Sequence, residues 1–342
     1  MTRIALPLLV LCLFACSGPS PSHVAVAAPL VAPVAPVAPA AGRDEPVQLW
    51  SDASIFGLVG GLIASARSRV LVEMYELGRP DLIRALGAAS KLGVDVRVIT
   101  DPTVAASRRS SMKLDRLGVP ERVYPIDDGR HQIDHVKLLI ADGEAVVGGM
   151  NWGAHSDRNH DYVLETGVPA EIGRLVRIFD QDWSLAAGQP APLAPAFGEV
   201  AQTAPGEEIR AMIERALVGA RQRVLAEVYT LTDPEVIAEL VAAKRRGVAV
   251  RVLLDPNQAY NRHGYEVLRA GGVDVRWYPI PKGALLHAKI GLFDADLILG
   301  SANWTLSGLG TNHELDISTG DSRAVAVFAT RFEADWSLAT GG

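Results

Sequence analysis

A short pattern of polar residues occurs twice in this 342-residue chain, with the same internal spacing each time. The first copy contains His135, Lys137 and Asp142, followed by the run Gly148-Gly149-Met150-Asn151-Trp152. The second copy contains His287, Lys289 and Asp294, followed by the run Gly300-Ser301-Ala302-Asn303-Trp304. Two copies of a reactive His/Lys/Asn set indicate one active site to which both halves of the chain contribute.

The repeat extends well beyond this pattern. Further residues match at offsets of 153 or 154 positions, namely Glu73 with Glu227, Tyr75 with Tyr229, Asp101 with Asp255, Tyr124 with Tyr278, and Asp182 with Asp335. A nearly constant offset over more than 100 residues indicates a duplicated domain. The small differences in offset fall between the matched segments, where changes in loop length are tolerated.

The N-terminal 15 residues are typical of an export signal. Arg3 is followed by an apolar run of about a dozen residues, which is shorter than the roughly 20 residues of a membrane-spanning helix. The run ends in Leu13-Phe14-Ala15-Cys16-Ser17, which resembles the lipoprotein box of bacteria, where cleavage precedes an acylated cysteine. Phe14 departs from the small or β-branched residue usual there. We expect an extracytoplasmic, cell-envelope lipoprotein on the outer membrane or the periplasmic face, with secretion as the alternative.

Residues 16–46 are rich in Ala, Pro and Val, and include three successive Val-Ala-Pro repeats. Proline at every third residue favours an extended, polyproline-like spacer and prevents helix formation. We therefore expect a signal peptide at 1–15, a disordered tether at 16–46, and two repeated halves at 47–188 and 199–340. The Pro- and Gly-rich residues 189–198 are the expected linker.

The first half has the pattern of an α/β domain. Alternating or β-branched runs predict strands at 70–75, 94–99, 135–140, 145–147 and 162–164, with a further short strand before Tyr124. Apolar periodicity predicts helices at 56–68, 80–92, 105–117 and 172–185, two of them followed by the stop residues Gly93 and Gly118. The second half repeats this order.

The composition narrows the classes of partner. The chain has 33 basic and 39 acidic residues, a formal net charge of −6. It therefore lacks the basic footprint of an avid nucleic-acid binder. Cys12 and Cys16 are its two cysteines, so no disulfide and no thiolate metal site is expected in either half. Nothing in the sequence indicates a protein partner.

The two halves resemble the phospholipase D superfamily, which is marked by paired His-x-Lys-x4-Asp motifs and a following Gly-Ser/Gly-x-Asn. The resemblance implies two α/β/α halves around a pseudo-twofold axis, with the motifs meeting at the interface. Within the superfamily, Gly148-Gly149-Met150-Asn151 and Phe179-Asp180-Gln181-Asp182-Trp183 resemble the cardiolipin synthase branch. Gly149 stands where the family more often has the serine that Ser301 retains.

The motif suits the chemistry of a phosphodiester. Residues i and i+2 of a strand face the same side, so each His and its Lys project together. Lys137 and Lys289 can offset the charge at phosphorus, while Asn151, Asn303 and Ser301 donate hydrogen bonds to the phosphate oxygens. One imidazole can attack phosphorus while the other protonates the departing alkoxide. The resemblance favours His135 as the nucleophile and His287 as the acid and base.

The resemblance also assigns supporting roles to four acids. Asp161 and Glu314, which follow the motif histidines by 26 and 27 residues, are expected to hydrogen-bond to the catalytic imidazoles. Asp161 is one methylene shorter than Glu314, which affects its reach. Asp142 and Asp294 are expected to support the loop backbone without touching substrate.

A metal site is the rival interpretation of the histidines. The chain lacks Glu-x-x-His clusters, and although His131 and His135 have the spacing His-x-x-x-His, a lysine beside each motif histidine repels a cation. We therefore expect no metal and no cofactor. His155 and His160 are expected in a solvated loop near the pocket mouth.

Four functions remain open from the sequence. The first is a phospholipase D, a phosphodiesterase that hydrolyses phospholipid head groups at the membrane to which the lipid anchor attaches it, with transphosphatidylation as a side reaction. The second is phosphatidyl transfer of the cardiolipin synthase type, although the chain lacks the transmembrane helices usual in that branch. The third is a nuclease of the same superfamily. The fourth is an inactive binding module, against which the intact His, Lys and Asn residues argue.

Overall fold

The computed structural model describes residues 47–195 and 198–341. The expected signal peptide, Cys16 and the tether lie outside the described residues. The strands of the first half are β1 (Val47–Ser51), β2 (Arg69–Met74), β3 (Asp95–Thr100), β4 (Glu121–Val123), β5 (Lys137–Ala141), β6 (Glu144–Gly148) and β7 (Tyr162–Thr166). Its helices are α1 (Ser54–Ser65), α2 (Pro80–Lys91), α3 (Ala105–Leu117) and α4 (Pro169–Leu185), with short 3-10 turns η1 (Asp128–Arg130) and η2 (Ser156–Arg158).

The second half repeats these elements in the same order. Its strands are β8 (Val200–Thr203), β9 (Arg223–Val228), β10 (Ala249–Leu254), β11 (Asp274–Trp277), β12 (Lys289–Phe293), β13 (Asp296–Gly300) and β14 (Glu314–Thr319). Its helices are α5 (Glu208–Gly219), α6 (Pro234–Arg245), α7 (Asn261–Ala270), α8 (Leu306–Gly310) and α9 (Ser322–Leu338).

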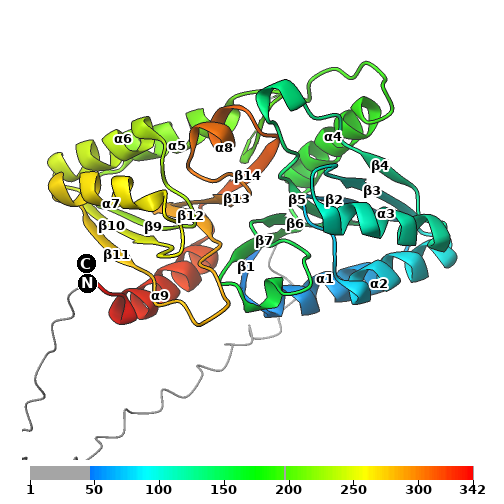
Figure 1. Ribbon diagram of the computed structural model, residues 1–342, viewed down its shortest axis with the longest axis horizontal. Coiled ribbons are helices and arrows are strands. Elements are labelled where there is room, and N and C mark those ends of the chain that lie inside the picture. The colour runs from blue at the N-terminus through cyan, green and yellow to red at the C-terminus, as the bar shows by residue number, and fades with distance from the viewer. Residues whose placement is uncertain (1–46, 196–197, 342) are drawn as a thin grey trace, which may run out of the picture. The chain divides into compact units, whose positions relative to one another are not determined.

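In the described residues, each half forms one seven-stranded mixed sheet (Figure 1). The strand order is β1-β7-β6-β5-β2-β3-β4 in the first sheet, and the equivalent order is β8-β14-β13-β12-β9-β10-β11 in the second. The strands joined by helices, such as β2 and β3, are parallel, whereas β5, β6 and β7 form an antiparallel meander. The duplication seen in the sequence is therefore a duplication of topology.

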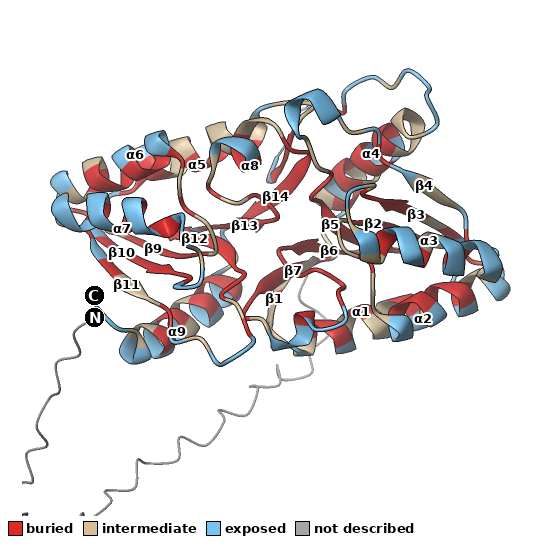
Figure 2. Ribbon diagram, viewed as in Figure 1, coloured by how far each residue is buried: buried red, intermediate tan, exposed pale blue. Residues whose placement is uncertain are grey.

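Helices cover both faces of each sheet. Apolar residues of α1 and α2 pack with one face of the first sheet, and α5 and α6 pack in the same way in the second half. The other faces share a single core with α4 and α9, and this core contains Leu138 and Phe179 from the first half and Leu292 and Phe328 from the second. Figure 2 shows the buried strands between helices whose outer faces are exposed. Burial of this shared apolar surface joins the two halves.

The contacts between the halves are reciprocal. The backbone N–H of His135 donates to the carbonyl of His313, and the N–H of His287 donates to the carbonyl of His160, both over 2.8 Å. Each bond has its equivalent in the other half, as a pseudo-twofold relation requires. The expected fold, two duplicated α/β/α halves, is confirmed.

Details of the expected elements differ at their ends. The motif strand begins at Lys137, and the preceding Asp134 and His135 pair with His313 of the other half. The edge strands β1 and β8, of five and four residues, were not expected as separate strands. No helix in the described part of the chain is both long enough and apolar enough to cross a bilayer.

Gly148 ends β6 where it passes very close to β7. A Cβ atom at this position would lie 2.3 Å from the carbonyl oxygen of Tyr162 and 2.6 Å from the Cα of Val163. Both atoms belong to the backbone of the neighbouring strand, which cannot move aside without breaking the ladder. Gly143 lies in the turn between β5 and β6, and a Cβ atom added there would meet no other atom within 4 Å.

We predict that Gly148→Ala lowers the free energy of unfolding by about 1–3 kcal/mol, the usual cost of overpacking a well-packed site. Gly143→Ala, in the same hairpin, serves as the control and should change it by less than about 0.5 kcal/mol. Urea denaturation of the full chain measures both. Equal stability of the two variants would contradict the close approach at Gly148.

Candidate active site

The two motif segments meet between the halves. His135 lies just before β5 and His287 just before β12, and each segment forms an isolated bridge to the opposite half. Because the main chains of both histidines are bonded across the interface, neither half can position its own motif alone. The sequence predicted one site made by two halves, and the structure places both motifs together.

Each motif histidine bonds to a carboxylate of the other half. His135 Nδ1 lies 2.8 Å from Glu314 Oε2, and His287 Nδ1 lies 2.7 Å from Asp161 Oδ2. All four side chains are buried. A carboxylate accepts, so each Nδ1 carries a proton and each Nε2 is the unprotonated nitrogen. Nε2 of His287 lies 3.1 Å from the ammonium nitrogen of Lys289. The pairing crosses the interface in both directions, which the sequence did not reveal.

Ser301 does not have the phosphate-binding geometry that was expected. Its hydroxyl donates to Glu314 Oε2 over 2.6 Å and accepts from the backbone N–H of Leu315. Glu314 Oε1 accepts from the amide of Asn312 over 3.0 Å. The hydroxyl of Ser301 is thus used to hold the carboxylate that orients His135.

The first half achieves the same result without a hydroxyl. A Cβ atom at Gly149, the counterpart of Ser301, would lie 2.3 Å from Asp161 Oδ1. The shorter carboxylate lies so close to the backbone that no side chain fits at Gly149. The first half therefore differs from the second by two linked changes: the shorter Asp161 occupies the space that a side chain at position 149 would need.

Burial makes the site lysines and imidazoles easy to deprotonate. Lys137 and Lys289 are 3% and 2% exposed, and burial lowers their pKa values to about 7 and about 8. Burial, together with Lys289, lowers the pKa of His287 to about 4, and the same causes with Lys137 lower that of His135. Near neutral pH the unliganded site therefore holds two neutral imidazoles and two partly charged lysines.

The two motif asparagines have uncommitted amide oxygens. Among the described residues, neither Asn151 Oδ1 nor Asn303 Oδ1 has a hydrogen-bond partner, although both atoms are buried. A buried polar group without a partner costs free energy unless a ligand or water satisfies it. These oxygens only accept, so they can bind a donor such as water or a hydroxyl, whereas the expected bonds to phosphate oxygens would come from the amide N–H groups.

Asp142 and Asp294 lie at the opposite end of the motif strands. Asp142 accepts from the backbone N–H groups of Arg67, Ser68 and Arg69, over 2.7–2.9 Å. Asp294 accepts in the same way from residues 221–223. They support a loop backbone, as the resemblance implied, but contact none of the other expected site residues.

The sequence reasoning missed two aromatic neighbours of the site. The ring of Tyr75 lies edge-on to His135 at 4.7 Å, and that of Tyr229 lies 4.8 Å from His287. The ammonium groups of Lys137 and Lys289 lie 5.0 and 5.1 Å from the same two rings. The repeated Glu-x-Tyr was the available signal.

The expectation that His160 lies in a solvated loop is wrong. It is 5% exposed and contacts carboxylates of both halves, whereas His155 is exposed. The reason is its position immediately before Asp161, where the chain enters β7 and pairs with the segment that precedes His287.

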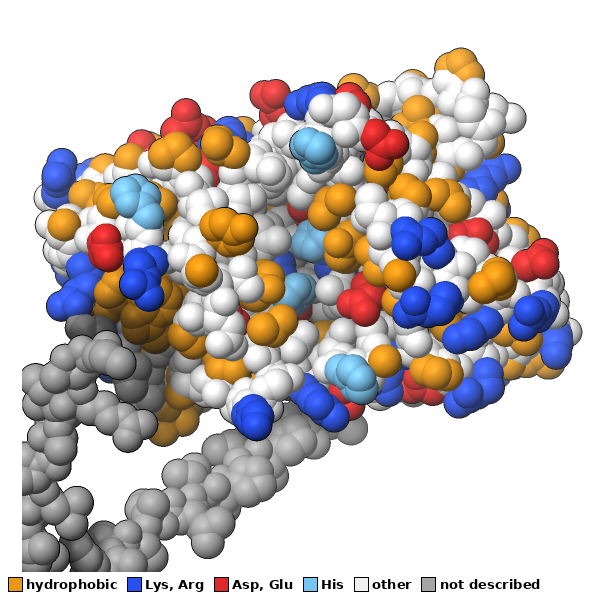
Figure 3. All heavy atoms as spheres, in the orientation of Figure 1, with side chains coloured by type: hydrophobic (Ala, Val, Ile, Leu, Met, Phe, Trp, Pro, Cys, Tyr) orange, Lys and Arg blue, Asp and Glu red, His pale blue; other side chains and the backbone are white. Residues whose placement is uncertain are grey.

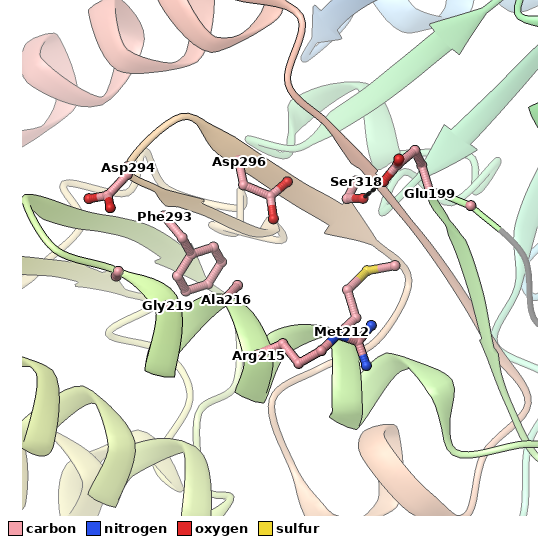
Figure 4. Close-up of a pocket in the computed structure, with 11 residues that line it drawn as sticks. Glu199, Met212, Arg215, Ala216, Gly219, Phe293, Asp294, Asp296 and Ser318 are labelled. Atoms are coloured by element: carbon pink, nitrogen blue, oxygen red, sulfur yellow. Dashed lines mark hydrogen bonds between the residues drawn. The ribbon is translucent and has the colours of Figure 1, made fainter.

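Figure 3 shows a hollow between the two halves with histidine and basic side chains in its floor. A separate surface pocket of about 370 Å³ lies on the second half, between α5 and β13 (Figure 4). Figure 4 shows Asp294 and Asp296 on one side of this pocket and Met212 and Arg215 on the other. It contains none of the paired His, Lys or Asn residues, so the chemistry belongs to the hollow between the halves.

We predict that the site binds a sulfate ion more weakly as the pH rises from 6 to 9. A lysine is charged below its pKa, so both cations are lost as the pH passes about 7 and about 8. Each loss weakens binding by up to about tenfold per pH unit above that pKa. Sulfate keeps its charge over this range, and isothermal titration calorimetry measures its affinity.

Lys137→Met should remove the part of this pH dependence that lies near pH 7. Lys113→Met, on the exposed face of α3, is the matched control and should leave the profile unchanged. Affinity that is independent of pH would show that the buried lysines do not bind the anion.

Comparison with known proteins agrees with this geometry. Residues 60–183 and 213–336 each match the sequence family described as "Cardiolipin synthase, PLD-like domain". The chain is 32% identical over 133 residues to the mitochondrial cardiolipin hydrolase of Homo sapiens and 28% identical over 113 residues to that of Chlamydomonas reinhardtii. These matches cover 38% and 32% of this chain, and about half the length of those relatives (52% and 50%).

Solved structures share the fold. Phosphatidylserine synthase from Haemophilus influenzae superposes with a TM-score of 0.65 at 13% identity, over 85% of this chain and 86% of that one. Polyphosphate kinase from Porphyromonas gingivalis superposes with a TM-score of 0.62 at 18% identity, over 85% and 50% of the two chains. The two family matches together span most of the described residues. The chain therefore belongs to the phospholipase D-like domain family, cardiolipin synthase type, and contains two copies of that domain.

Proposed function

We propose that this protein is a phospholipase D-type phosphodiesterase that releases the head groups of phospholipids through a phospho-histidine intermediate. The observation that carries the proposal is the pair of motif imidazoles, each with Nδ1 fixed on a buried carboxylate, which leaves Nε2 unprotonated, beside two buried lysines. Relatives named as cardiolipin hydrolases support a phospholipid substrate.

The proposed reaction has two steps. In the first, Nε2 of His135 attacks phosphorus, an N–P bond forms, and the P–O bond to the head group breaks while His287 gives a proton to the departing alkoxide. In the second, water attacks phosphorus, the N–P bond breaks, and His287 takes the proton of the water. Lys137 and Lys289 offset the negative charge on the phosphoryl oxygens throughout.

The electrostatics of the site suit this sequence of events. Without substrate, both imidazoles are neutral because burial and the lysines lower their pKa values, so an attacking nitrogen is available. A bound phosphodiester brings one negative charge next to the ammonium groups. That charge offsets their effect on the second imidazole and favours its protonated form, which is the form that donates to the leaving group.

Phosphatidyl transfer is the second candidate function. Here an alcohol, for example the glycerol of a second lipid, takes the place of water in the second step. The match of both halves to the cardiolipin synthase type of domain favours it. A nuclease and an inactive binding module are weaker candidates, because the net charge is −6 and both motifs are intact.

The test is incubation of the full chain with phosphatidylcholine, phosphatidylglycerol and single-stranded DNA in separate reactions. We predict release of the head group with no cleavage of DNA. Cardiolipin formed from phosphatidylglycerol would favour the transferase instead. Cleavage of DNA with intact lipids would overturn both.

Within this assay, His135→Ala and His287→Ala should each lower kcat by at least about a thousandfold, because each removes the nucleophile or the acid. His155→Ala, an exposed histidine near the motif, is the matched control and should keep full activity. Mass spectrometry of the trapped intermediate identifies which histidine carries the phosphoryl group and is therefore the nucleophile. A phosphoryl group on His287 would make His287 the nucleophile and His135 the acid and base.

We also propose that the protein is held at the cell envelope through acylated Cys16, which places the site near its lipid substrate. Growth with labelled palmitate should label the full chain, and Cys16→Ser should abolish the label, because the acyl chain has no other attachment point in the proposal. Cys12→Ser is not a usable control, since it lies in the segment expected to be removed. An unlabelled wild-type chain would indicate secretion.

A further inference from the structure

Two buried histidines lie next to the acids that hold the motif imidazoles. His160 precedes Asp161, and His313 precedes Glu314. Neighbouring residues of an extended segment point to opposite sides, so each histidine faces away from the acid that follows it. The proposed reaction uses neither histidine. Both are nevertheless surrounded by residues that the duplication retained in both halves, namely Glu73 and Glu227, Tyr124 and Tyr278, and Asp182 and Asp335.

The contacts of His313 require a charged ring. Nδ1 lies 3.1 Å from the carbonyl oxygen of Thr203, which can only accept. Nε2 lies 3.1 Å from Asp182 Oδ2 and 3.4 Å from Glu73 Oε1. Both nitrogens therefore carry protons. The ring of Tyr124 stacks on the imidazole at 4.6 Å with an interplanar angle of 4°.

His160, in the first half, is likewise surrounded by carboxylates and stacked on a tyrosine of the second half. Nδ1 lies 2.7 Å from Asp52 Oδ1, and Nε2 lies 2.9 Å from Glu227 Oε2. Tyr278 stacks on this ring at 5.0 Å with an angle of 2°. Burial lowers the pKa of both histidines, but the surrounding carboxylates outweigh burial and raise each pKa well above its ordinary value.

The main chain of each histidine holds the opposite motif. His313 donates its N–H to the carbonyl of Ile133 and accepts from the N–H of His135. His160 donates to the carbonyl of Leu285 and accepts from the N–H of His287. Each residue therefore has its backbone bonded to the motif of the opposite half and its side chain in contact with two carboxylates of that half, to which His160 adds Asp52 of its own half.

We infer that His160 and His313 are positioning residues: charged anchors that fix the following acid, Asp161 or Glu314, against the motif histidine of the opposite half. The inference rests on the proposed function only for its effect on turnover. The anchors do not touch the reacting atoms. They fix the distance between carboxylate and imidazole, on which the tautomer and the direction of attack depend.

The carboxylates around His160 contact a second cation in addition to the histidine, and those around His313 differ in this respect. The guanidinium of Arg331 lies 3.0 Å from Asp52 and 2.9 Å from Asp335, so the acids around His160 share a second cation. At the offset that relates Asp182 to Asp335, the first half has Ile178 instead. The acids around His313 have no guanidinium at this place, and burial raises the pKa of Glu73 to about 7.

A divalent cation is the alternative partner for these acids. In each cluster, one histidine nitrogen and two carboxylate oxygens lie within 4.8 Å of one another, and the clusters are Glu73–Asp182–His313 and His160–Glu227–Asp335. A metal ion would require an unprotonated Nε2. Charged anchors and metal ligands are therefore mutually exclusive, and elemental analysis of the purified full chain separates them.

The test compares His313→Gln with His160→Gln in the full chain, by head-group release and by proton NMR of the Nδ1–H signals of the motif imidazoles. Glutamine retains a donor but not the charge. Each variant should lower kcat about 10- to 100-fold with KM within about twofold, the usual effect of losing a group that orients a reactive histidine. His313→Gln should shift the signal of His135, and His160→Gln that of His287, with each signal identified by its absence in the corresponding alanine variant.

The control is Asp321→Ala, which removes the N-cap of α9, where Asp321 accepts from the N–H groups of Arg323 and Ala324. It should lower stability by a known mechanism and leave kcat and both signals unchanged. If His313→Gln does not fold, Asp182→Asn removes the partner charge at constant shape and should shift the His135 signal alone.

Three outcomes would overturn the inference. They are unchanged kcat and signals in a folded anchor variant, equal shifts of both motif signals in either variant, and one equivalent of divalent metal per chain that His313→Gln or His160→Gln loses. If the wild-type protein releases no head group, the NMR signals still test the anchors, so failure of the proposed function is distinguishable from failure of the inference.

Discussion

The structure depends on two hydrogen bonds that cross between the halves, Glu314 to His135 and Asp161 to His287. Each half supplies an imidazole to its own motif and a carboxylate to the other, so neither half has a complete site by itself. A shared apolar core and reciprocal backbone bonds hold the interface in place. Reactivity and the association of the halves are therefore one structural property.

Burial shifts the protonation of the site residues and also costs free energy, because charged groups lose their contact with water. Removing lysines and imidazoles from water disfavours their charged forms, which leaves neutral imidazoles and lysines that are only partly charged near neutral pH. The carboxylates beside them are buried as well, and Glu314 is held by Ser301, Asn312 and His135. An arrangement with so many desolvated charges is stable only when each finds its partner.

Much of the fold followed from sequence, because alternation, helical periodicity and glycine stops are local signals. Helix α3 has the bounds that its pattern predicted, whereas the edge strands β1 and β8 were too short to give a pattern. His160 was misplaced for a different reason. A lone histidine in a polar segment resembles a loop residue, and only its partners in the other half, Glu227 and Asp335, bury it.

The sequence by itself determined the duplication, the family and the residue types of the candidate site, because a repeated motif at a constant offset is visible without coordinates. Only the tertiary structure decided which acid serves which histidine, that Ser301 holds a carboxylate, and that Gly149 is required by the shorter Asp161. It also showed that Asp142 and Asp294 lie away from the site. These facts depend on distances between residues far apart in the chain, which the order of amino acids does not state.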